Sequence, residues 1–151
     1  MAADIQVRSV TAEDVALVAM RMRGPDRDEA AHHHLSPIEG LRQSIAVSLE
    51  SWTVVIDGVP AAIFGLSPRG ALPGGAPWLL ATDAFAMGGG LRIGRQARRI
   101  VASWSRGMAL ENYCDTRNTV ALRFLEWLGF RIELHKGCVM AKFWMPQGGC
   151  R

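Results

Sequence analysis

A glycine triplet followed by arginines is the first feature of this sequence that could do chemistry. The apolar run "WLLATDAF" (residues 78–85) leads into three glycines (residues 88–90), and Arg92 and Arg95 follow. Glycines let a backbone approach a ligand closely, and the first amides of a helix, helped by arginines, attract anions. The segment can therefore cradle a phosphorylated ligand. A plain connection between a strand and a helix explains the same residues, and both interpretations stay open.

Histidine and cysteine offer no comparable metal chemistry. The run His32-His33-His34 spreads its imidazoles around a helix, without the i, i+4 spacing of a metal-binding pair. The three cysteines, Cys114, Cys138 and Cys150, form no paired motif, so the sequence indicates neither a disulfide framework nor a four-ligand zinc site. We expect no metal, a reducing compartment, and a buried, inert thiol at Cys114.

Composition excludes several classes of protein. The 151 residues suit one domain (1–151), and 49% hydrophobic with 21% charged residues is a globular balance without the signature of disorder. No apolar run reaches the length of a membrane span, and no signal segment is evident. The net charge of +3 is concentrated in the arginine-rich stretch 92–106. Such a stripe suits an anionic ligand better than a duplex, or it is simply a solvated helix face.

The elements that must position these residues follow from periodicity, caps and turns. Asp57-Gly58 gives the clearest hairpin signal, Thr11 and Ser36 are expected N-caps, and residues 26–36 have no clear pattern. The expected elements are strand 5–10, helix 12–23, helix 37–52, a hairpin over 53–64, a loop over 68–77, a buried central strand over 78–85, helix 91–106, strand 110–116, helix 119–128, and strands 130–134 and 139–144. The sequence thus predicts an α+β domain with a mixed sheet of about six to seven strands and about four helices.

The segment "NTVALRFLEWLGF" (residues 118–130) resembles the second signature of the GNAT acetyltransferases. The matching positions are Asn118, Ala121, Phe124, Leu125, Gly129 and Phe130. Each also has a structural role in a helix that Asn118 caps and Gly129 ends. The chain is similar in more detail to GNAT-like proteins of short-tailed phages, through "PWLLATD" and "NYCDTRNTVALRFLEWLGF".

The resemblance implies acetyl-CoA as cofactor and an amine as acceptor, with transfer of the acetyl group between them. It implies that the central strand pairs with the pantetheine arm, that amides near Ala81 polarise the thioester carbonyl, and that the next helix holds the pyrophosphate. The cofactor-binding positions that it implies are Leu80, Ala81, Thr82, Gly88, Gly89, Gly90, Arg92, Arg95 and Asn118. "GGGLRIGRQA" departs from the family's phosphate loop, and Leu125 replaces a proton-donating tyrosine found in many members.

Acetylation of an amine also needs a base, because an ammonium must lose a proton before its nitrogen attacks. Asp83, at the end of the central strand, has the best position; Glu29, Glu39 and the histidine run are alternatives, and Asp83 can equally cap a loop. Tyr113 is expected in the core. A non-catalytic phage virion or morphogenesis protein, or a phage effector acting on a host protein in the bacterial cytoplasm, are the competing hypotheses. No membrane and no nucleic-acid partner is expected.

Overall fold

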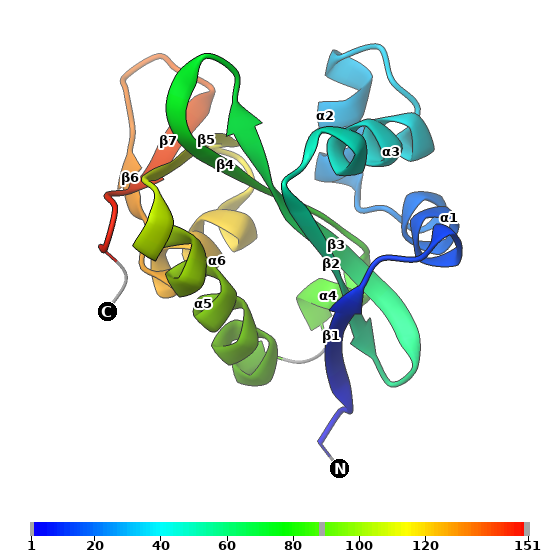
Figure 1. Cartoon of the computed structure of the whole chain (residues 1–151). Helices are drawn as coiled ribbons and strands as arrows, with labels where there is room; N and C mark the ends of the chain where they lie inside the picture. The colour runs from blue at the N-terminus through cyan, green and yellow to red at the C-terminus, as the bar shows by residue number, and fades with distance from the viewer. Residues whose placement is uncertain (1, 88–89, 150–151) are drawn as a thin grey trace. The chain divides into compact units, whose positions relative to one another are not determined.

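Seven strands in the order β1-β2-β3-β4-β5-β7-β6 form one mixed sheet, in which β4 and β5 run parallel. The computed structural model of the chain describes residues 2–87 and 90–149. Its elements (Figure 1) are β1 (Ile5–Ser9), α1 (Ala12–Met20), α2 (Gly24–His32), α3 (Pro37–Val47), β2 (Glu50–Ile56), β3 (Val59–Arg69), β4 (Leu72–Ala81), α4 (Asp83–Met87), α5 (Gly90–Gly107), β5 (Leu110–Asp115), α6 (Thr119–Leu128), β6 (Arg131–Glu133) and β7 (Met140–Met145). The α+β class and the mixed sheet are confirmed, with six helices in the described residues instead of about four.

The chain divides into two compact units. The first comprises residues 1–67 and 78–93, and the second comprises residues 68–77 and 94–151. In the first unit, β1, β2 and β3 are antiparallel, and α1, α2 and α3 lie together on one side of them (Figure 1). The core of this unit is a cluster of buried apolar side chains from α1, α3 and β3, against which Trp78 and Leu80 of β4 pack.

Both expected N-caps in the first unit are confirmed. Thr11 accepts a hydrogen bond from the Asp14 N–H while the Asp14 carboxylate accepts one from the Thr11 N–H, which is a complete capping box. Ser36 caps α3 through the Glu39 N–H, with Pro37 in the first turn. Asp57 and Gly58 both have positive φ, as a tight hairpin turn requires.

Two helix boundaries in the first unit differ from the expectation. Helix α1 ends at Met20 instead of Arg23, because Met22 leaves the helix and pairs with Thr82 at the end of β4. Helix α3 ends at Val47 instead of residue 52, because the chain must already be extended at Glu50, where β2 begins.

Helix α2 was not predicted at all. Of its nine residues, the buried ones are Asp26 and Ala30, so the helix has no apolar stripe that periodicity could detect. Gly24-Pro25, directly after the predicted helix 12–23, opens this helix, with proline in its first turn.

The predicted loop over residues 68–77 is mostly strand, which corrects the expectation. Strand β3 continues to Arg69 and β4 starts at Leu72, so two residues connect them. Gly74 has φ +94°, and a Cβ there would lie 2.6 Å from the Ala109 carbonyl oxygen. The glycine is therefore needed for a close approach of two backbones, not for a loop. At the other end, β4 stops at Ala81, short of the expected residue 85, because Asp83 opens α4.

The second unit contains β5, β7 and β6 in antiparallel pairs, α6, and α5 from Gly94 onward. Asn118 caps α6 through the Ala121 N–H, and Gly129 ends it with φ 105°, both as expected. Two expectations for β5 are wrong: Tyr113, expected in the core, is 53% exposed, and Cys114, expected to be buried, is half-buried. Among residues 110–115 of this strand, Leu110 is the buried one. None of the helices in the described parts of the chain combines the length and apolar character that a membrane span requires.

Candidate active site at the end of strand β4

Strand β4 is fixed in the first unit by Trp78. The indole lies over Gly65 of β3, where an added Cβ would come within 2.8 Å of the ring. The Trp78 Nε1–H donates to the Ser48 Oγ at 2.7 Å, and Ser48 and Ser67 are linked at 3.2 Å. These contacts hold the three residues of β4 that follow Trp78, which include Leu80 and Ala81 of the predicted cofactor-binding stretch.

Backbone hydrogen bonds show which edge of β4 each residue faces. The Thr82 N–H donates to the Ala61 carbonyl oxygen of β3 at 2.9 Å, and the Thr82 hydroxyl donates to the same oxygen. Successive residues of a strand direct their backbone groups to alternate edges. Leu80 therefore shares the β3-facing edge with Thr82, whereas Leu79 and Ala81 face the opposite edge.

The opposite edge at Ala81 is occupied by the segment between α1 and α2. The Ala81 N–H donates to the Asp26 Oδ2 at 2.8 Å, and the Ala81 carbonyl oxygen accepts from the Arg23 N–H at 2.8 Å. Asp26 is 5% exposed, and this burial raises the pKa of its carboxyl, while the Ala81 N–H and the charge of Arg23 partly oppose the rise. Both backbone groups of Ala81 thus already have partners within the chain.

Arg27 holds this segment in place. Its Nε donates to the Met22 carbonyl oxygen at 2.9 Å, one of its terminal nitrogens donates to the Met20 carbonyl oxygen at 2.8 Å, and its own N–H donates to the Arg23 carbonyl oxygen. The guanidinium therefore ties the end of α1 and the first turn of α2 into one unit.

Asp83, the predicted base, is exposed at the start of α4. It lies on the wall of a hollow of about 410 Å³ in the first unit, lined also by Met20, Arg21, Met22, Arg27, Val59, Pro60, Thr82 and Ala84. An exposed carboxylate on an open hollow can exchange protons with water and with a bound amine. The alternative bases Glu29 and Glu39 are exposed on α2 and α3.

The predicted phosphate cradle is only partly within the described residues. Gly88 and Gly89 lie outside them, as does the side chain of Arg92. Gly90 is the first residue of α5, an 18-residue helix, and Arg95 is exposed on its second turn. The later arginines Arg98, Arg99 and Arg106 are exposed as well, so α5 presents a solvated basic face, and Arg98 stacks on Trp127 at 5.4 Å.

The second-signature residues have structural partners in the second unit. The Asn118 Oδ1 accepts the Ala121 N–H at 3.3 Å, so this side chain is engaged in the cap. Leu125 is half-buried on α6. His32, His33 and His34 are exposed at the end of α2, and within the described residues no three His, Cys, Asp or Glu side chains gather as metal ligands.

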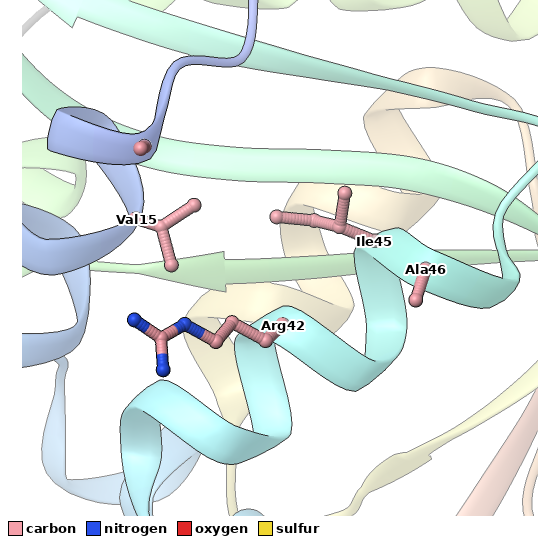
Figure 2. Close-up of a pocket in the computed structure, with 5 residues that line it drawn as sticks. Val15, Arg42, Ile45 and Ala46 are labelled. Carbon is pink, nitrogen blue, oxygen red and sulfur yellow. The ribbon is translucent and has the colours of Figure 1, made fainter.

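A second hollow of about 260 Å³ lies between α1 and α3 (Figure 2). Val15 of α1 faces Ile45 and Ala46 of α3 across it, and the Arg42 side chain extends along it toward α1. Arginine stays protonated and cannot serve as a base at neutral pH. This hollow therefore lacks proton-transfer chemistry, and the end of β4 remains the candidate active site.

Sequence reasoning missed Asp26, whose carboxylate binds the predicted cofactor strand. Pro25 followed by an acidic residue is a helix-start signal, so the element could have been found. Nothing local indicates that Asp26 turns inward and reaches Ala81, which is 55 residues away in the chain.

Comparison with known proteins gives the fold a name. A GNAT-family acetyltransferase from Bacillus anthracis matches with TM-score 0.63 and 10% identity, over 95% of this chain and 94% of that one. A putative acetyltransferase from Salmonella typhimurium with its cofactor acetyl-CoA matches with TM-score 0.61 and 14% identity, over 93% and 91%. A ribosomal L7/L12 alpha-N-protein acetyltransferase in complex with coenzyme A matches with TM-score 0.62 and 9% identity, over 96% and 95%.

No family model matches the chain, and neither does any curated protein sequence. At identities of 9–14% the structural likeness establishes the fold: the chain has the GNAT acetyltransferase fold. The finer resemblance to phage proteins stays a prediction.

Proposed function

We propose that this chain is an acetyl-CoA-dependent N-acetyltransferase that acts on an amine. The observation that carries the proposal is the match of nearly the whole chain to acetyltransferase structures, two of which contain coenzyme A or acetyl-CoA. A fold alone does not determine chemistry, so the residues at the end of β4 must also suit the cofactor.

The backbone of β4 suits a ligand that carries amides. An outward-facing residue of a strand offers one N–H and one C=O side by side, and an extended arm with amide groups can pair with them as an added strand does. Within the stretch Leu80, Ala81 and Thr82, the outward groups are those of Ala81, and alternation gives Leu79 the same direction. We assign the pantetheine arm to this edge, where Asp26 and Arg23 now bind Ala81.

The phosphates are assigned to the segment that follows β4. Gly88, Gly89 and Gly90 would contribute backbone amides, and Arg92 and Arg95 would contribute positive charge at the beginning of α5. Asn118 is assigned to the cofactor by the resemblance to the second signature. When bound, acetyl-CoA supplies an acetyl group activated as a thioester.

Asp83 is assigned to proton transfer. An amine reaches its reactive form only after it loses a proton, and the Asp83 carboxylate in the open hollow accepts that proton directly or through water. Leucine at position 125 donates no proton. The leaving thiolate therefore takes its proton from solvent or from another group.

Calorimetric titration with acetyl-CoA and with free CoA tests the cofactor assignment. We expect micromolar binding to the wild-type protein and a loss on the order of tenfold in Arg95→Ala, because a charge-assisted hydrogen bond contributes roughly 1.5 kcal/mol. Arg106→Ala is the matched control, since Arg106 is exposed in the last turn of the same helix. Absence of binding at millimolar acetyl-CoA would overturn the proposal.

Asp83→Ala should lower the acetylation rate about 100-fold, the lower range for removal of a general base. The measurement is release of free CoA thiol from acetyl-CoA in the presence of a panel of amines. Asp28→Ala, which removes an exposed carboxylate from α2, should leave the rate unchanged. Equal rates in Asp83→Ala and the wild-type protein would withdraw the base assignment.

The second candidate is a non-catalytic binding protein on the same scaffold. The occupied edge at Ala81 favours it, because a cofactor must displace Asp26 and Arg23 to pair there. The resemblance to phage proteins points to a virion or assembly partner, or to a host protein in the bacterial cytoplasm. Recovery of the chain in purified phage particles, with no acetyl-CoA binding, would support this candidate over the enzyme.

A further inference from the structure

The segment of residues 22–26, here named the strap, satisfies the same backbone groups that a paired cofactor arm would use. Its Arg23 N–H binds the Ala81 carbonyl oxygen, and its Asp26 carboxylate binds the Ala81 N–H, both at 2.8 Å. The strap thus provides a donor for the Ala81 carbonyl oxygen and an acceptor for the Ala81 N–H. A bound arm and the strap cannot both occupy this edge.

We propose that the strap competes with acetyl-CoA for the outward edge of β4 at Ala81, so that full engagement of the cofactor requires release of Asp26. This inference rests on the proposed function, and it adds a regulation of cofactor binding at the same site. Asp26 is a positioning residue in this scheme: it touches Ala81, and through Ala81 it determines how readily the cofactor pairs with the strand.

The construction of α2 suits an element that can move. Its buried residues are Asp26 and Ala30, so release of α2 from Asp26 onward exposes little apolar surface, whereas Met22 at the start of the strap is 4% exposed and belongs to the core. Its attachment is polar instead, through Asp26 to Ala81 and through Arg27 to the carbonyl oxygens of Met20 and Met22. Polar contacts of this kind can be exchanged for contacts with water or with a ligand at small net cost.

The energetics of Asp26 point the same way. Burial disfavours its ionised form, whereas the hydrogen bond from Ala81 favours it. The closed strap therefore holds a carboxylate in a desolvated position, and opening returns that carboxylate to water. A closed state that is populated in the free protein reduces the apparent affinity for the cofactor by the fraction of molecules that are open.

Two measurements on the full chain test the strap. Amide hydrogen exchange at Ala81 reports the closed strap without any cofactor, and calorimetry with acetyl-CoA reports the competition. The variants are Asp26→Ala, Asp26→Asn, which keeps an acceptor oxygen, and Arg27→Ala, which loosens the strap without touching Ala81. Asp28→Ala, an exposed carboxylate two residues along the same helix, is the matched control.

We expect Ala81 exchange to accelerate at least tenfold in Asp26→Ala, and the dissociation constant for acetyl-CoA to fall about tenfold. Arg27→Ala should likewise accelerate Ala81 exchange and lower the dissociation constant. Asp26→Asn should give values between those of the wild-type protein and Asp26→Ala, and Asp28→Ala should behave as wild type. If Asp26→Ala does not fold, the same two measurements on Arg27→Ala decide whether the strap competes with acetyl-CoA.

Two other outcomes are distinguishable. If the folded variants bind acetyl-CoA as the wild-type protein does, or more weakly, the strap proposal is overturned and the proposed function stands. If no variant binds acetyl-CoA at millimolar concentration, the proposed function is overturned and the competition with it, while exchange at Ala81 still reports how the strap closes.

Discussion

Asp14→Ala should lower the free energy of unfolding by about 3 to 4 kcal/mol, the range for removing one partner from a buried, charge-assisted network. Asp14 is 1% exposed and accepts two hydrogen bonds from the Arg8 guanidinium, at 2.6 and 2.9 Å. It also accepts the Thr53 hydroxyl and the Thr11 N–H, both at 2.9 Å. One carboxylate thus joins β1, β2 and the start of α1.

Lowering the pH should remove the stability that the ionised Asp14 carboxylate contributes, within a defined pH range. Burial by itself raises the pKa of Asp14, but the hydrogen bonds from Arg8, Thr11 and Thr53 outweigh burial and lower the pKa to about 2. A lowered carboxyl pKa gives stability that is complete above the unfolded value near 3.8 and is lost as pH falls toward 2. Asp14→Asn should therefore cost about 2 kcal/mol at neutral pH and almost nothing at pH 2.

Urea denaturation of both variants at neutral and acidic pH measures these effects. For Asp14→Asn, the cost of about 2 kcal/mol at neutral pH corresponds to a fall in Tm of roughly 4 to 8 °C. Glu13→Ala is the control, because Glu13 is an exposed carboxylate in the same helical turn. A deficit in Asp14→Asn that persisted unchanged at pH 2 would contradict the assignment of the stability to the ionised carboxylate.

Local signals were enough for the elements with caps and apolar stripes. Thr11, Ser36, Asn118 and Gly129 all have the expected roles, because a cap needs one side chain and its nearest amides. The hairpin at Asp57-Gly58 is equally local. These features are determined within four or five residues, so a single sequence contains the information.

Features that depend on distant partners could not be predicted in this way. Helix α2 buries Asp26 through a hydrogen bond to Ala81, and Gly74 belongs to a strand because the Ala109 backbone approaches it. The composition of residues 68–77 is typical of a loop, yet the sheet imposes an extended conformation on most of them. Tyr113 is an aromatic residue on a strand, which is typical of a core position, yet its side chain is 53% exposed.

The candidate site also contains both kinds of feature, those that local sequence predicts and those that depend on distant partners. Asp83 and the end of β4 could be proposed because a strand followed by a polar residue is visible in the sequence, and the structure places Asp83 on an open hollow. That Ala81 is already hydrogen-bonded was not visible, because neither Arg23 nor Asp26 resembles a strand partner. The cofactor roles of these residues stay proposals that the titrations above decide.

Gly65→Val should lower the free energy of unfolding by about 3 kcal/mol, at the upper end of the range for inserting atoms into a packed core. A Cβ at Gly65 would lie 2.7 Å from the Glu50 carbonyl oxygen and 2.8 Å from the Trp78 ring. The backbone oxygen cannot move without breaking the β2–β3 pair, so the strain falls on the indole. Displacing the indole also breaks its hydrogen bond to Ser48.

The same substitution should disturb the site, because Trp78 lies three residues before Ala81 on β4. We expect Gly65→Val to accelerate amide exchange at Ala81 as well as to lower the urea midpoint. Gly107→Ala at the end of α5 is the matched control, since no atom lies within 4 Å of a Cβ added there and its φ is not positive. This variant should leave both readouts near wild type. A Gly65→Val protein with wild-type stability would mean that Trp78 can repack freely, and that it does not fix the end of β4.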